Sequence, residues 1–193
     1  EWMTIKLCDI SKKVIEKKAT SVCQDVFTNS AEFGVINQRD FFDHDVANVD
    51  NIQGYYIVRP NDYVYNPRIS TTAPVGPINR NKLGCCGVMS PLYYVFRVEK
   101  QSDGILHFLD YYFKSNMWHD FMFKNGNSGA RSDRFSISDS TFSLMPILYP
   151  QKEEEQLNIG QVFINMEKLM RTESIKLSKF RSMKQSLLQK MFV

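Results

Sequence analysis

The C-terminal segment from Gln151 to Val193 constrains the fold most, because its apolar residues recur at alternating spacings of three and four. This heptad pattern is sustained for more than four repeats, with polar interruptions at Glu173 and Lys184. Its apolar members are Ile159, Phe163, Met166, Met170, Leu177, Phe180, Leu187 and Met191. At about 1.5 Å per residue the helix would extend roughly 60 Å, further than the preceding domain could cover. We predict a long amphipathic helix whose apolar stripe is a coiled-coil interface.

Charge is distributed unevenly along this helix. Up to Glu173 five acids meet three bases, whereas from Ser174 onward there are five bases and no acid. An antiparallel partner with the same layout would set acid against base, although the helix macrodipole favours the same layout in any single helix. Two outcomes are therefore open: helix pairing, or folding back onto the preceding domain. Gly160 is a predicted weak point, because glycine costs up to about 1 kcal/mol in a helix interior.

The composition predicts one globular domain followed by this helix. The 193 residues are 43% hydrophobic and 13% aromatic, enough to build a proper core. We place a mixed α+β domain at residues 1–148 and the helix at 149–193, hereafter the arm. No run approaches eighteen apolar residues and no signal-peptide pattern is present, which favours a soluble, cytoplasmic protein. Because the chain starts at Glu1 rather than at methionine, we expect a trimmed piece of a longer chain.

Neither the cysteines nor the acids form a convincing metal site. Cys8, Cys23, Cys85 and Cys86 follow no metal-binding spacing and no regular disulfide framework, so we interpret them as reduced packing residues. The acids between Asp40 and Asp50 could hold Mg²⁺, but a solvated loop is the favoured interpretation. No metal site is therefore predicted.

Short strands and two helices are predicted within the domain. The expected strands are residues 30–36, 55–59, 63–65, 92–98, 135–137 and 142–144, and residues 2–10 are either a short strand or an irregular lead-in packed by Trp2. Pro60-Asn61-Asp62 should form a hairpin or a tight corner between two of them. A helical pattern begins at Asp103, and Asn116 can cap a second helix that ends at Gly126. This mixture indicates the α+β class.

Two long polar loops, residues 66–82 and 125–134, are the best candidates for a binding site. Removing the arm's eight bases and five acids from the chain's 24 and 21 leaves sixteen of each, so any nucleic-acid site must be local. Arginine and asparagine side chains read base edges, and basic or hydroxyl side chains contact phosphates. The candidate DNA contacts are Arg68, Ser70, Thr71, Thr72, Asn79, Arg80, Lys82, Asn127, Arg131 and Arg134. Ordinary solvated loops are the alternative interpretation.

No catalytic constellation is visible. Asn66-Pro67 and Ser90-Pro91-Leu92-Tyr93 each only partly match the catalytic loop of amino-methyltransferases, and no methyl-donor motif accompanies them. We find no phosphate-binding loop and no nucleophile elbow. The sequence therefore predicts a non-catalytic protein.

The order of several motifs resembles the specificity subunit of type I restriction-modification systems. The motifs are Trp2, Leu7, Asp9 and Ile10; Tyr65-Asn66; the block from Gly87 to Phe96; Gly129-Ala130-Arg131; Pro150, Glu154 and Gln156; and the ending Leu187 to Phe192. The likeness covers nearly the whole chain and implies one target recognition domain followed by one conserved-region helix. Complete members of the family resemble two such units in tandem, so this chain matches a half-subunit or a fragment of a two-domain subunit.

The resemblance also implies the partners. Double-stranded DNA with a bipartite site, a methyltransferase (modification) subunit, a restriction subunit and a second half-subunit paired through the arm are expected. S-adenosylmethionine, ATP and Mg²⁺ would then belong to the partner subunits, and this chain would bind no cofactor. A protein-interaction scaffold without DNA is the main rival interpretation, and a solitary DNA methyltransferase is the second.

Overall fold

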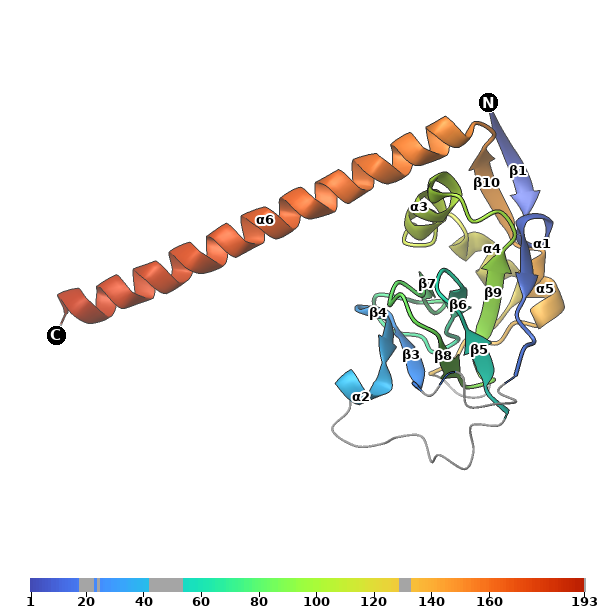
Figure 1. Cartoon of the computed structure of the whole chain (residues 1–193), viewed down its shortest axis with the longest axis horizontal. Helices are drawn as coiled ribbons and strands as arrows, with labels where there is room; N and C mark the ends of the chain where they lie inside the picture. Colours follow the sequence, from blue (N-terminus) through green and yellow to red (C-terminus); the bar gives the residue numbers. More distant parts are fainter. Residues whose placement is uncertain (18–22, 24, 42–53, 129–132, 193) are drawn as a thin grey trace.

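The computed structural model describes residues 1–17, 23, 25–41, 54–128 and 133–192. Figure 1 shows a globular domain from which one long helix, α6 (Glu153–Met191), projects far beyond the other elements. The ends of the domain meet in an antiparallel pair formed by β1 (Trp2–Lys6) and β10 (Pro146–Pro150). Trp2 pairs with Pro150, and its indole Nε1 donates to Glu155 Oε1 at 2.7 Å. The root of α6 is therefore fixed beside the N-terminal strand.

A four-stranded antiparallel sheet forms the centre of the domain. Its order is β2 (Ser11–Lys13), β9 (Tyr94–Val98), β6 (Tyr63–Tyr65) and β7 (Ile78–Arg80). Side chains alternate across a strand, so Phe96 faces the larger core under the helices while Val95 faces a second core. Both faces of the sheet are therefore covered.

Two small antiparallel pairs complete the strands: β3 (Phe27–Ser30) with β4 (Gly34–Asn37), and β5 (Tyr56–Val58) with β8 (Gly87–Met89). β5 and β6 lie in different sheets, so Pro60-Asn61-Asp62 is the predicted tight corner and not a hairpin. Asn61 adopts a φ of 70°, and the Asp62 N–H donates to the Arg59 carbonyl at 3.1 Å.

The short helices depart from the prediction in several places. The strand expected over residues 2–10 ends at Lys6, where a short helix begins, and the helix at residues 38–41 was not predicted. The elements are α1 (Leu7–Ile10), α2 (Gln38–Phe41), α3 (Asp103–Tyr112), α4 (His119–Asn125) and α5 (Asp139–Ser143). α4 ends before Gly126 as predicted but starts after Trp118, which is buried and donates to the Phe113 carbonyl, so Asn116 does not cap it. The predicted strand at 142–144 is wrong because the Ser138 hydroxyl accepts from the Thr141 N–H and starts α5.

The expectation of four reduced cysteines is wrong for one pair. Cys23 and Cys86 form a disulfide although 63 positions separate them in sequence. Backbone pairing aligns them, because the Val88 N–H donates to the Asp25 carbonyl at 2.8 Å. Cys8 and Cys85 are free and exposed. None of the described helices has both the length and the apolar character needed to cross a membrane.

Candidate nucleic-acid interface

The structure brings the two polar loops together. The Ile69 N–H donates to the Asp133 carbonyl at 3.0 Å, and the Phe135 N–H donates to the Pro67 carbonyl at 2.8 Å. Arg68 and Arg134 face each other in an antiparallel bridge between these bonds. The expected strand at 135–137 is replaced by this bridge and by one that joins Ser136 to Asn127. Segments more than sixty residues apart in sequence thus form one surface.

The tip of the first loop is a tight turn that is supported by buried residues. The Ser70 hydroxyl accepts from the Ala73 N–H at 3.1 Å, which leaves Thr71 and Thr72 exposed. Val75 is fully buried, and its carbonyl accepts from the Tyr65 hydroxyl at 2.8 Å. Burial raises the pKa of Tyr65, so this hydroxyl stays protonated as the donor. The loop buries more apolar side chains than its composition suggested, and these buried residues fix the position of its exposed tip.

Arg68 is the most exposed cation among the described residues of the two loops. Its side chain is 64% exposed, and its ion pair with Asp133 is long at 3.9 Å. An exposed pair of this length contributes little to stability, so the guanidinium is available to another anion or to a base edge. Arg134 differs, because its Nε is buried and has no hydrogen-bond partner among the described residues.

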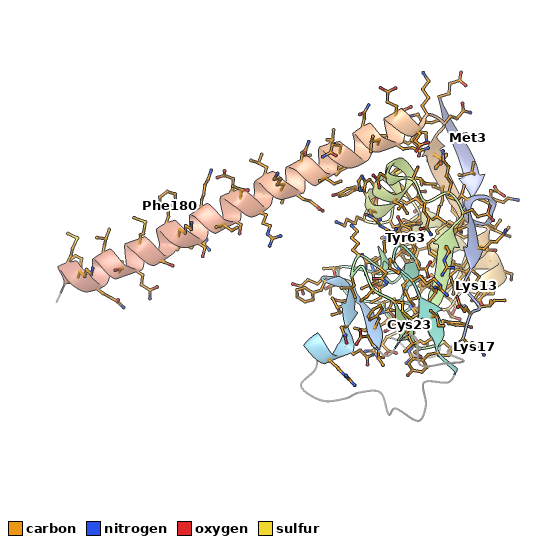
Figure 2. All side chains as sticks on the ribbon, viewed as in Figure 1. Met3, Lys13, Lys17, Cys23, Tyr63 and Phe180 are labelled. Carbon is orange, nitrogen blue, oxygen red and sulfur yellow. A yellow bond between two sulfur atoms is a disulfide. The ribbon has the colours of Figure 1, made fainter. Side chains whose placement is uncertain are left out.

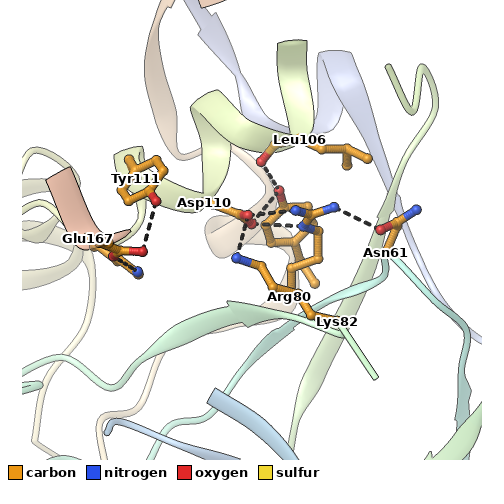
Figure 3. A network of polar contacts seen from close by, with 9 residues as sticks. Asn61, Arg80, Lys82, Leu106, Asp110, Tyr111 and Glu167 are labelled. Carbon is orange, nitrogen blue, oxygen red and sulfur yellow. Dashed lines mark hydrogen bonds and ion pairs between the residues drawn. The ribbon is translucent and has the colours of Figure 1, made fainter. Parts of the chain in front are cut away.

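Arg80 has a different role from the one predicted by its loop position. Its Nε and Nη2 donate to the two carboxylate oxygens of Asp110 at 2.9 and 2.7 Å, and Nη1 donates to Asn61 Oδ1 at 2.8 Å (Figure 3). Only 10% of its side chain is exposed. The Tyr63 hydroxyl closes the same network by donating to the Leu106 carbonyl at 2.9 Å. This arginine joins β7 to α3 and has no free donor face to offer DNA.

The remaining predicted residues fall into separate places. Asn79 donates to Asn29 Oδ1 at 2.8 Å and to the Ser30 carbonyl, so its amide is used inside the domain. Lys82 contacts Asp110 at 2.7 Å but remains 56% exposed. Asn127 is exposed beside Ser136, and Arg131 lies outside the described residues. The structure thus gathers Arg68, the Ser70–Thr72 tip, Asn127 and Arg134, and separates them from the β7 residues, which line a different cleft.

Leu92 and Tyr93 belong to this surface although sequence reasoning gave them no role in binding. They line two clefts, of about 330 and 380 Å³, one bordered by Pro67 and Arg134 and the other by Arg68 and Ser70. Leu92 is 41% exposed. The strand expected at residues 92–98 begins only at Tyr94, because Pro91 lies in a turn that is closed by the Tyr93 N–H, which donates to the Ser90 carbonyl at 3.1 Å.

No group of three or more His, Cys, Asp or Glu side chains is placed to hold a metal ion among the described residues. Of the acids considered for Mg²⁺, Asp43, Asp45 and Asp50 lie outside the described residues, and the side chain of Asp40 is also not described.

The first part of the arm docks on its own domain. Phe163 stacks on Tyr111 with ring centroids 4.9 Å apart, and Ile159 packs against the larger core. Glu167 accepts from Tyr111 at 2.9 Å and from Lys114 at 2.6 Å (Figure 3). A Cβ on Gly160 would overlap His107, so the predicted weak point is where α6 and α3 come closest. Ile159 and Phe163 are therefore at least partly used within the domain.

Beyond this contact the arm is free of the domain. Every residue from 165 to 192 is exposed, and Figure 2 shows Phe180 far from the globular part. Six predicted interface residues lie here: Met166, Met170, Leu177, Phe180, Leu187 and Met191, each between 50% and 73% exposed. An apolar stripe of this length in water indicates a missing partner.

Two solved structures share this fold of an α+β domain followed by a long helix: a chain of a type I R-M system and an HsdS subunit. The first comes from a study of complex assembly and conformational transition of a type I R-M system, with TM-score 0.65 and 12% identity over 100% of this chain and 50% of that chain. The second is the HsdS subunit from Thermoanaerobacter tengcongensis, with TM-score 0.56 and 16% identity over 99% and 44%.

The present chain spans about half the length of these two solved chains. No protein-family model and no curated protein sequence matches it. The likeness confirms, at the level of fold, the resemblance to the specificity subunit and the α+β class with a long C-terminal helix.

Proposed function

We propose that this chain is a non-catalytic, sequence-specific DNA-recognition subunit of a type I restriction-modification enzyme. The observation that carries the proposal is the pairing of the two polar loops on a domain with the fold of half an HsdS subunit. In this proposal residues 1–148 are the target recognition domain, and the arm holds two such domains apart over a bipartite site. Catalysis, and with it S-adenosylmethionine, ATP and Mg²⁺, belongs to methyltransferase and restriction subunits that bind this chain.

Direct contacts with DNA are assigned to the paired loops. Arg68 is placed to read a guanine or to hold a phosphate, and the hydroxyls of Ser70, Thr71 and Thr72 supply short donors beside it. Asn127, Arg131 and Arg134 extend the same role, with Leu92 and Tyr93 in apolar contact between the two clefts. Lys82 is a further candidate contact from the separate cleft beside β7. Arg80 and Asn79 act as positioning residues, because both are engaged inside the domain.

Salt dependence tests DNA binding directly. Fluorescence anisotropy with a labelled duplex should give an affinity that falls linearly with salt on a double logarithmic plot, because phosphate contacts release counterions. Arg68→Ala is compared with Arg59→Ala, which removes another exposed arginine that is paired with an acid, Glu16, outside the loops. We expect a loss only for Arg68→Ala. An affinity insensitive to salt, or equal losses for both variants, would contradict the proposal.

Sequence specificity requires a second measurement. Cells that express this chain with its candidate methyltransferase subunit should carry methylated adenines in one motif with two separated parts. If the Arg68 side chain reads a base, Arg68→Ala should cost about 1 to 3 kcal/mol of binding free energy and relax the motif at one position. If the side chain holds a phosphate, the variant should bind all sequences more weakly to the same extent. Methylation that does not depend on this chain would remove the assigned function.

A further inference from the structure

The free part of the arm carries its two polar interruptions in mirror positions. Its stripe begins at Met166, where α6 leaves the domain, and continues to Met191. Glu173 lies seven residues after the first of these methionines and Lys184 lies seven residues before the second. A stripe with this symmetry, one acid and one base included, is complementary to itself when it is reversed.

We infer that two copies of this chain pair through residues 166–191 in one antiparallel register, in which Glu173 of each copy faces Lys184 of the other. The inference rests on the proposed function for its partner, a second half-subunit, and adds the register. In an antiparallel coiled coil each residue at an a position packs against one at a d position of the other helix. The layers are then Met166 on Met191, Met170 on Leu187, Glu173 on Lys184, and Leu177 on Phe180.

The neighbouring registers are disfavoured by charge and by the domain. Shifting the partner one heptad toward the domain sets Lys184 on Met166 and Glu173 on Leu177, and it brings Met191 beside Ile159, which packs against the domain core. Shifting it one heptad the other way sets Glu173 on Met191 and Lys184 on Phe180. Each shift packs Lys184 and Glu173 against apolar side chains, which is costly and leaves Glu173 only its ion pair with Lys176 of the same helix. The inferred register instead gives two opposite-charge contacts between the helices for each pair of arms.

A parallel pair has no such match. It would set Glu173 on Glu173 and Lys184 on Lys184 inside the seam. Polar residues at core positions lower stability but select orientation and register. The two polar interruptions look like defects in a single helix, but in a pair they specify the orientation and the register of the second copy.

The register also fixes the distance between the two recognition domains. Met166 of one copy lies beside Met191 of the other, so the points at which the arms leave their domains are separated by about 37 Å at about 1.5 Å per residue. That separation is close to one helical turn of DNA, about 34 to 36 Å. Two domains held at this spacing can meet the same side of a duplex at successive turns.

Charge exchange tests the register in the full chain. Glu173→Lys alone and Lys184→Glu alone should each weaken self-association at least tenfold in sedimentation, because each puts like charges in two layers. Mixing the two variants should restore a dimer, because every layer then joins an acid to a base. Ser178→Lys, on the exposed side of the helix away from the stripe, is the matched control and should remain dimeric. Two single variants that stay dimeric would overturn the register.

Cysteine cross-linking distinguishes register from pairing. In a background with Cys8 and Cys85 changed to serine, Met170→Cys chains mixed with Leu187→Cys chains should form an intermolecular disulfide, and neither variant should do so alone. Cross-linking of Met170→Cys with itself indicates a parallel pair and overturns the inference while leaving dimerisation intact. A wild-type chain that sediments as a monomer would overturn both pairing and register, but DNA binding by its loops would still be measurable by anisotropy.

Discussion

The two parts of α6 have similar sequences and opposite environments. Residues 153–165 and residues 166–191 both carry apolar residues at heptad spacing. The first part meets α3 through glycine, because a Cβ on Gly160 would overlap His107 and a Cβ on Gly104 of α3 would lie only 3.0 Å from the Glu153 carbonyl oxygen. The second part has Phe180 65% exposed and Leu187 55% exposed. The helix thus packs on the domain over its first turns, and its apolar side chains are exposed to water over the rest.

The difference shows that packing, and not helix propensity, decides what each part does. A heptad stripe only requires some apolar partner, and in the first part the domain supplies it through Tyr111 and the larger core. Leaving large side chains in water forgoes about 1.5 to 3 kcal/mol each relative to burial. We therefore expect substitutions in the first part to change the stability of the domain and substitutions in the second to change assembly.

The largest expected effect is on assembly. Phe180→Asp removes an apolar seam residue from both arms of a pair and places two carboxylates in the seam, so pairing should weaken by about 4 kcal/mol, roughly a thousandfold in Kd. Sedimentation measures the dissociation. Ser182→Asp, on the polar side, is the control and should leave the dimer intact. An undiminished dimer for Phe180→Asp would show that the free part is not the seam.

Gly160→Leu should produce the largest loss of domain stability. The new side chain would have to occupy the space of His107, whose carbonyl carbon would lie only 3.1 Å from an added Cβ. Overpacking of this kind costs about 3 kcal/mol, read as a lower midpoint in urea. Ser182→Leu in the free part is the matched control, and its expected effect lies within about 0.5 kcal/mol. Equal midpoints for the two variants would remove the distinction between the parts.

Sequence reasoning predicted the arm and, at least in part, the strands β1, β5, β6 and β9, but it missed β2, β7, β8 and β10 and did not predict the partners of polar groups. Arg68 and Arg80 belong to the same loop and look equivalent in the sequence. Asp110 on α3 nevertheless forms an ion pair with Arg80, whereas Arg68 stays exposed. The pairing of Cys23 with Cys86, and of residue 69 with residue 133, likewise depends on long-range topology that no local pattern reports. Gly160 looked like a weak point because the sequence alone does not show that α3 packs against it.

A moderate loss of domain stability is expected when the half-exposed ring of Phe163, in the docked part of α6, is removed. Phe163→Ala removes the stack on Tyr111, but Phe163 is already 43% exposed, so the loss should be about 1 to 2 kcal/mol of unfolding free energy. Leu177→Ala is the comparison, because it removes an apolar side chain of the free part and should leave the unfolding of an isolated, dilute chain unchanged. A loss in Leu177→Ala at low concentration would indicate a domain contact that the structure does not contain.

The smallest effect concerns the ion pair at the boundary of the two parts. Burial opposes the shift, but hydrogen bonds from Lys114 and Tyr111 lower the pKa of Glu167 below its ordinary value. A carboxyl whose pKa is lower in the folded state stabilises the fold fully above its unfolded pKa and loses that contribution as the pH falls through the folded value. Glu167 is 54% exposed, so Glu167→Gln should cost no more than about 0.5 kcal/mol at pH 7. Urea midpoints of the two proteins should converge below about pH 4, since a protonated Glu167 resembles glutamine. A difference that persists in acid would mean that Glu167 supports the boundary by packing, and that the change from docked to free helix does not depend on its charge.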